Sequence, residues 1–137
     1  MKLITRHTDY AVSALCCIAK KAGPATVSEL CTELEMPYAF LRGILQKLQK
    51  NGILGSSKGR TGGFELAKRP DKISLFRIMD IFQDTLRANG CVLKKHPCPR
   101  RKDCVLRKSI SRVQNIMREK FEAITIQSLL QKRVLDK

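Results

Sequence analysis

Tryptophan is absent from this chain of 137 residues, and aromatic residues make up only 5% of it. Proteins that bind single-stranded nucleic acid stack bases on exposed rings, so that mode of binding is poorly supported. Long hydrophobic runs are absent as well: no stretch reaches the roughly 18 apolar residues of a membrane-spanning helix, and the N-terminal apolar run shows no convincing signal-peptide cleavage site. We therefore expect a cytoplasmic protein with no membrane partner.

Acidic side chains are scarce. The chain has 12 Asp and Glu against 27 Lys and Arg, which gives a net charge of +15. A field of that sign concentrates polyanions, and double-stranded DNA is the commonest of them. Patterns of catalysis are missing too, because no acid/base pair or nucleophile set is apparent and the glycines of 59–63 do not form a P-loop. We expect a DNA-binding protein and not an enzyme.

The first half of the chain has the pattern of a helix-turn-helix. Apolar residues at helical spacing predict helices at about 9–22, 27–35 and 37–50. Thr26 and Glu29 fit a capping box at the start of the second helix, and Pro37 suits the first position of the third. Two short helices joined by a tight turn are typical of this motif.

A β-hairpin is expected directly after the third helix. Asn51-Gly52 fits the cap that ends that helix. Ile53-Leu54 and Phe64–Ala67 are short extended runs on either side of the Gly-rich segment Gly59–Gly63. A hairpin in this position is a wing.

The second half combines a short helix, a loop and a long helix. Ser74 fits the cap of a helix that ends near Phe82, and 83–104 lacks periodicity. From Val105 onward an apolar stripe recurs at helical spacing and predicts a long amphipathic helix with a seam narrow enough to meet another helix; its members are Leu106, Ile110, Val113, Met117, Phe121 and Ile124.

These patterns define a mainly α fold with a small β-hairpin, a winged helix-turn-helix plus a long C-terminal dimerisation helix. Residues 1–70 are expected to form the DNA-binding domain. Residues 71–104 hold the short helix and the cysteine-containing loop, and residues 105–137 the dimerisation helix and tail.

The candidate DNA-binding residues lie on the third helix and at the wing. We expect Arg42 to contact guanine, and Lys47 and Lys50 to hold phosphates. Such residues are also compatible with the ordinary solvated face of a small helical bundle, but the net charge and the basic hairpin favour DNA. The full set is Tyr38, Ala39, Arg42, Gln46 and Lys47 on the helix, with Lys58 and Arg60 at the wing tip, where they can reach a minor groove or its phosphates.

Three of the six cysteines fall in the polar loop. Cys91, Cys98 and Cys104 have the spacing C-x6-C-x5-C. Thiolates prefer zinc or the iron of an iron–sulfur cluster. These gaps do not match the close pairs of a zinc knuckle, and wider gaps suit a larger cluster. A redox-active thiol set and three ordinary surface cysteines remain open.

The other three cysteines, Cys16, Cys17 and Cys31, lie in predicted helices among apolar neighbours. Thiols in such places are mostly small buried hydrophobic groups, so they are assigned no function.

The chain resembles the iron–sulfur-cluster regulators typified by IscR, NsrR and RirA, which form the Rrf-two family. The matching stretches run in family order over nearly the whole chain; they are Met1–Thr5 with Tyr10-Ala-Val, Leu48–Leu54, Gly59-x-x-Gly-Gly-Phe-x-Leu-Ala67 and the three cysteines Cys91, Cys98 and Cys104. The resemblance implies a homodimer whose long C-terminal helices cross. It also implies a cluster, [4Fe–4S] or [2Fe–2S], held by these three cysteines, which changes DNA affinity when it is altered or lost.

The fourth ligand departs from one branch of the family. IscR-type members have His three residues after the last cysteine, where this chain has Arg107, which cannot ligate iron. Asp9 stands where NsrR-type members use an acidic ligand given across the dimer, so the resemblance favours Asp9. An acidic residue also suits the start of a helix without any metal. His96 and His7 are further candidates.

The expected function is a promoter-binding regulator, a repressor, whose cluster senses nitric oxide, redox state or iron–sulfur supply. One alternative is a thiol-redox or zinc-stabilised regulator without a cluster. Another is a small electron carrier or cluster-delivery protein, although such a protein has no use for a basic reader of duplex DNA.

Overall fold

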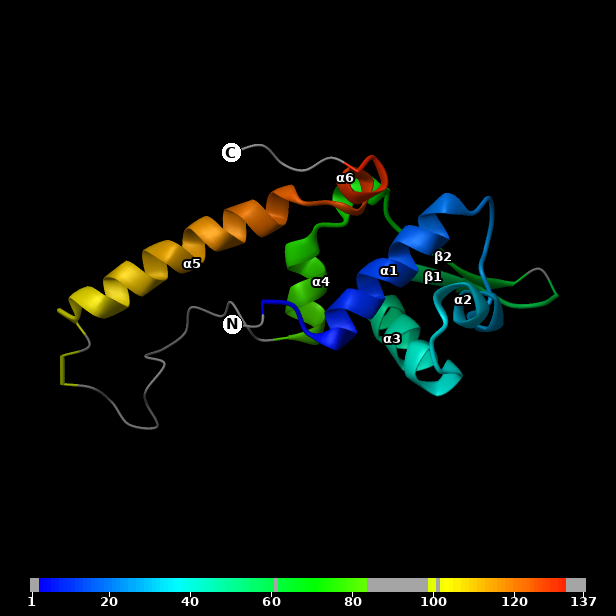
Figure 1. Ribbon diagram of the computed structural model, residues 1–137, viewed down its shortest axis with the longest axis horizontal. Coiled ribbons are helices and arrows are strands. Elements are labelled where there is room, and N and C mark those ends of the chain that lie inside the picture. The colour runs from blue at the N-terminus through cyan, green and yellow to red at the C-terminus, as the bar shows by residue number, and fades with distance from the viewer. Residues whose placement is uncertain (1–2, 61, 84–98, 101, 133–137) are drawn as a thin grey trace.

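The structure is a computed structural model that describes residues 3–60, 62–83, 99–100 and 102–132. The chain forms a compact winged-helix unit from which one long helix projects (Figure 1). In chain order the elements are α1 (Arg6–Lys20), α2 (Val27–Leu34), α3 (Tyr38–Lys50), β1 (Leu54–Ser57), β2 (Gly63–Leu66), the 3-10 helix η1 (Pro70–Lys72), α4 (Leu75–Phe82), α5 (Val105–Ala123) and α6 (Ile126–Leu130). The mainly α fold with a small hairpin is confirmed.

One hydrophobic core joins the first three helices to elements from the second half of the chain. Leu15 of α1, Leu30 of α2 and Leu45 of α3 are fully buried in it. Ile78 of α4 and Ile126 of α6 belong to the same cluster. Because each helix presents one apolar face, packing these faces together fixes the positions of α2 and α3.

The expected helix caps are present. The Thr26 hydroxyl accepts a hydrogen bond from the Glu29 N–H, and the Glu29 carboxylate accepts one from the Thr26 N–H. Ser74 caps α4 by accepting from the Arg77 N–H. Gly52 has a φ of +76°, the left-handed conformation expected just after α3.

The predicted starts of α1 and α3 and the predicted end of α1 were wrong. α1 begins at Arg6 and not at residue 9, because the Thr5 side chain caps it by accepting from the Thr8 N–H. α1 also ends at Lys20, which leaves Ala22 outside the helix and exposed. Pro37 is the cap residue before α3 and not its first helical residue, since its ψ of 135° is extended.

The wing is an antiparallel pair that is anchored to the helical unit. Leu54 pairs with Leu66, and Ser57 pairs with Gly63. The Phe64 N–H donates to the Ala25 carbonyl at 2.8 Å, and the Ala25 N–H donates back to the Phe64 carbonyl at 2.9 Å. These two bonds hold the hairpin against the segment between α1 and α2.

In the described part of the chain, the C-terminal end of α5 is bonded to the winged-helix unit. The Leu75 N–H donates to the Ile124 carbonyl at 2.7 Å, and the Ile126 N–H donates to the Ile73 carbonyl at 3.0 Å. The Arg118 guanidinium lies over the Phe76 ring of α4, 4.9 Å from its centroid. The other end of α5 points away from the helix-turn-helix (Figure 1).

Within the part of the chain described, no helix combines the length and the hydropathy needed to cross a membrane.

Candidate nucleic-acid interface and metal-ligating residues

One face of α3 is exposed and carries four of the predicted DNA-binding residues. Leu41, Ile44, Leu45 and Leu48 are buried on the opposite face. The exposed face therefore presents a continuous row at helical spacing, made of Tyr38, Ala39, Arg42 and Gln46. Tyr38 is 52% exposed, a large value for an aromatic side chain. A helix with an open polar face of this kind can enter a major groove and meet base edges.

Lys47 lies at the edge of that face. Its ammonium stands over the ring of Phe82 in α4, 5.3 Å from the ring centroid. It is still exposed, so it can meet a phosphate, but from the α4 side of the helix and not from the row that contains Arg42.

The turn between α2 and α3 sets the direction of α3. Glu35 ends α2 in the left-handed conformation, with φ 52° and ψ 46°. Met36 is 9% exposed, and its N–H donates to the Cys31 carbonyl at 3.2 Å. Met36 thus anchors the turn in the core, and Pro37 then starts α3 in a new direction.

The wing tip presents two exposed basic side chains, Lys58 and Arg60, as predicted. Gly59 between them has a φ of +106°. The Gly62 N–H donates to the Gly59 carbonyl at 3.0 Å and closes the turn. Because only three residues separate α3 from β1, the basic tip and α3 are close in sequence and belong to the same winged-helix unit.

Of the three predicted cysteine ligands, Cys104 lies in the described part of the chain. It is the cap residue of α5, and its Sγ accepts a hydrogen bond from the Arg107 N–H at 3.4 Å. The open N–H groups at the start of a helix favour negative charge, so this position suits a thiolate. Cys91, Cys98 and the candidate His96 lie outside the described residues.

Asp9 and His7 both lie in the first turn of α1 and are exposed. The His7 ring packs on Phe40 of α3, with 4.8 Å between the ring centroids. Among the residues described, no three His, Cys, Asp or Glu side chains of one chain lie close enough to hold a metal ion.

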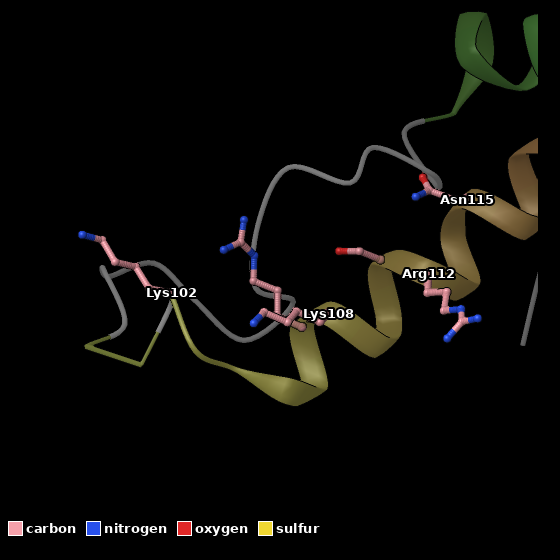
Figure 2. A pocket seen from close by; sticks show the side chains of 6 residues that line it. Lys102, Lys108, Arg112 and Asn115 are labelled. Carbon is pink, nitrogen blue, oxygen red and sulfur yellow. The ribbon is translucent and has the colours of Figure 1, made fainter.

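Basic side chains surround the start of α5. Figure 2 shows Lys102 in the turn before the helix, with Lys108 and Arg112 along its first half. Together with Arg107, Ser111 and Asn115 they line a shallow cavity. Their positive charge lies close to Cys104 in sequence and would offset the negative charge of thiolate ligands.

Cys17 fits the interpretation of a buried hydrophobic thiol, since it is 6% exposed. Burial, and after it the Glu33 carboxylate, raises the pKa of its thiol to about 11. Burial also raises the pKa of Cys16. Cys16 and Cys31 are half-buried, and both pack against the core.

One polar contact has no counterpart in the sequence pattern. The side chain of Gln83, at the end of α4, forms hydrogen bonds with three residues around the first turn of α1, namely Leu3, Thr5 and Thr8. Periodicity and motif spacing carry no signal for such a contact, because its partners lie 75 to 80 positions apart.

Residues 4–132 match the family model of the Rrf2 iron-dependent transcriptional regulators. The chain belongs to the Rrf2 family. The expected family is therefore confirmed, and with it the coarser function of a DNA-binding transcriptional regulator.

Two sequence relatives illustrate the similarity. A protein of Aquifex aeolicus named as an HTH-type transcriptional regulator is 32% identical over 124 residues, which cover 88% of this chain and 86% of the relative. The regulator NsrR of Halalkalibacterium halodurans is 30% identical over 90 residues, or 64% of this chain and 62% of that protein.

Among solved structures, CymR of B. subtilis, the global cysteine regulator, is similar in fold. Its TM-score is 0.77 at 20% identity, with 98% of this chain and all of that chain covered. At this level of identity the similarity shows a shared fold and nothing about what the protein senses.

Proposed function

We propose that this Rrf2 protein is a homodimeric repressor whose promoter binding is controlled by an iron–sulfur cluster. The observation that carries the proposal is the position of Cys104 at the outer end of α5, a helix whose other end is bonded to the winged-helix unit. A group bound at Cys104 can therefore act on the DNA-reading surface through the chain itself. Like its family, the protein is expected to work in the cytosol.

The dimer is proposed from the exposed stripe on α5. Leu106, Ile110 and Val113 are 65%, 41% and 52% exposed, whereas Met117 and Phe121 further along the same stripe are half-buried. The winged-helix unit covers the C-terminal part of the stripe and leaves the N-terminal part open. Exposed apolar stripes of this kind mark an interface, and a second copy can bury it symmetrically.

The residues present fit a cluster. Cys104 supplies a thiolate at a helix N-terminus, next to basic side chains that balance its charge. We propose Cys91 and Cys98 as the other thiolate ligands and Asp9 as the fourth ligand. As the resemblance to NsrR-type members implies, Asp9 would come from the partner subunit.

A bound cluster would supply a centre that reacts with nitric oxide or oxygen and depends on iron supply. The chain's own residues would do the rest. Arg42 and Gln46 read base edges in the major groove, while Lys58 and Arg60 hold the minor groove or its phosphates. The angle between the two reading surfaces of the dimer then sets the promoter affinity.

The proposal is tested by anaerobic reconstitution with iron and sulfide. We expect a brown protein that binds DNA from upstream of its own gene with an affinity different from that of the apo form. Equal affinity of the two forms would exclude sensing by a cluster. Zinc without acid-labile sulfide in anaerobically purified protein would support the zinc-stabilised alternative, and reversible disulfides without iron would support the thiol-redox alternative.

The fourth ligand is tested with Asp9→Asn, which keeps the size of the side chain. A ligand role predicts a cluster that is lost several-fold faster in air, measured by the decay of its visible absorbance. A role limited to the helix N-terminus predicts an unchanged cluster and a small loss of stability of the apo protein. Asp71→Asn in η1 is the matched control, and an unchanged lifetime in Asp9→Asn would turn attention to His96 and His7.

A further inference from the structure

Gln83 connects the end of α4 to the first turn of α1 by three hydrogen bonds. Its Oε1 accepts from the Thr5 N–H at 3.0 Å and from the Thr8 hydroxyl at 2.6 Å. Its Nε2 donates to the Leu3 carbonyl at 2.8 Å. One amide side chain thus serves partners from three residues that lie 75 or more positions away in the sequence.

The buried hydroxyl of Thr8 needs a hydrogen-bond partner, and Gln83 supplies it. Thr8 is a polar residue with 0% exposure. A buried hydroxyl is costly unless it is hydrogen-bonded, so the Thr8 side chain favours the arrangement in which Gln83 reaches it. The Thr8 hydroxyl also lies 3.1 Å from that of Thr5, which caps α1. The Gln83 bonds to Leu3, Thr5 and Thr8, which we call the Gln83 bridge, and the cap of α1 therefore form one hydrogen-bonded unit.

Both elements joined by the bridge touch the recognition helix α3. His7, in the first turn of α1, packs on Phe40 with 4.8 Å between the ring centroids. Phe82, the neighbour of Gln83, lies under the ammonium of Lys47. His7, Phe40, Lys47 and Phe82 also line one cavity, which lies between α1, α3 and α4. A shift of α4 relative to α1 must change at least one of these contacts with α3.

The Gln83 bridge is also close in sequence to the proposed cluster ligands. Gln83 follows α4 directly, and the next part of the chain carries Cys91 and Cys98. Asp9 is one residue after Thr8. Three of the four ligands proposed above, Asp9, Cys91 and Cys98, are therefore close in sequence to the two elements that Gln83 joins.

We propose that Gln83 is a positioning residue that couples the first turn of α1 and the end of α4 to the recognition helix. The inference deepens the proposed function and rests on it for the identity of the signal. In this role Gln83 keeps the two elements in one register, so that a displacement at either is transmitted to Phe40 and Lys47.

The first test uses the apo protein and needs no cluster. Gln83→Leu removes the bonds to Leu3, Thr5 and Thr8, and amide hydrogen exchange is measured residue by residue. We expect exchange at the Thr5 amide and at the α3 amides from Phe40 to Lys47 to become at least tenfold faster. The Thr26 amide, which also donates to a side chain at a helix start, is the internal control and should stay unchanged. Faster exchange at Thr5 with no change in α3 would overturn the coupling.

Graded variants separate coupling from a loss of fold. Gln83→Glu keeps an oxygen that accepts from Thr5 and Thr8 but replaces the N–H donor to Leu3 with a second acceptor oxygen. We therefore expect an intermediate increase in the exchange rates. In a cycle of Thr8→Val, Gln83→Leu and the double variant, we expect the effects on α3 exchange to be non-additive because both changes break the same bridge. Gln131→Leu, the same change at an exposed site, is the control and should have no effect.

The second test compares DNA affinities of the reconstituted and apo forms. Wild-type protein should show a ratio different from one, and in Gln83→Leu that ratio should approach one while the apo affinity stays within about threefold. A merely structural role would lower both affinities equally and keep the ratio. If wild-type protein itself gives a ratio of one, the proposed sensing fails, and the exchange experiment still decides whether Gln83 is coupled to α3.

Discussion

At the scale of single residues, Gly63 shows how a close backbone contact constrains the wing. A Cβ at this position would lie 2.5 Å from the Ala25 carbonyl oxygen, and φ is +152°. The close approach follows from the pairing of Phe64 with Ala25, which holds β2 against the helical unit. The sequence indicated a Gly-rich turn here, but the reason for glycine at this position is a tertiary contact.

Gly63→Ala is expected to destabilise the protein by about 1–3 kcal/mol, because the backbone must leave its left-handed conformation or push Ala25 away. The free energy of unfolding in urea measures the loss. Gly43→Ala is the matched control: no atom lies within 4 Å of its added Cβ, and alanine in a helix should stabilise by about 0.5–1 kcal/mol. Equal effects of the two changes would contradict the close contact.

Cys17 gives a prediction about pH. Its thiol has an ordinary pKa of 9.0 in the unfolded chain and, through burial, a pKa of about 11 in the folded protein. Above pH 9 the unfolded chain loses the proton first, so this group's contribution to stability is complete below pH 9 and is lost as the pH rises to 11. In native protein at pH 8, iodoacetamide should therefore label Cys17 far more slowly than the half-buried Cys104, as measured by mass spectrometry of peptides. Comparable labelling rates would show that the thiol is not buried.

At the scale of elements, the helix-turn-helix follows from local signals. The Thr26–Glu29 box and the Ser74 cap were predicted from residue types alone, since capping bonds span only three residues. The start of α1 was missed by three residues, because Thr5 is not followed by an apolar run. Its cap is reinforced by Gln83, which is distant in sequence.

The α5 stripe predicts how the protein assembles. Val113→Asp places a charge in the exposed stripe and should convert the dimer to monomers, as measured by sedimentation equilibrium. Because Val113 is 52% exposed in a single chain, the monomer should keep its fold and its helical circular dichroism. Asn115→Asp adds the same charge outside the stripe and should leave the dimer intact. A monomeric wild-type protein, or a dimer that survives Val113→Asp, would exclude this interface.

At the scale of the whole molecule, the net charge of +15 favours binding to DNA, and the proposed contact surface lies on α3 and the wing. Arg42, Lys58 and Arg60 are exposed on α3 and the wing, which follow one another directly in the fold. Each phosphate neutralised by such a residue releases counterions, so the affinity for DNA must fall as the salt concentration rises.

We expect Arg60→Ala to lower the slope of log affinity against log salt by about one, because one phosphate contact is lost. Arg42→Ala should instead weaken binding by about 1–3 kcal/mol and relax the preference for one base. Lys72→Ala, a change to an exposed lysine of η1, should alter neither quantity. Both are measured by fluorescence anisotropy over a range of salt, and an effect of Lys72→Ala equal to that of Arg60→Ala would contradict a local interface.

The sequence by itself determined the helices, the hairpin, the family and the exposed row of α3. These depend on periodicity, caps and motifs, which act over a few residues or repeat along one face. Only the tertiary structure decided that Gly63 touches Ala25, that α5 is held at one end and open at the other, and that Gln83 joins α4 to α1. Such contacts arise when distant segments pack together, and no local pattern encodes which polar side chain will then find a buried partner.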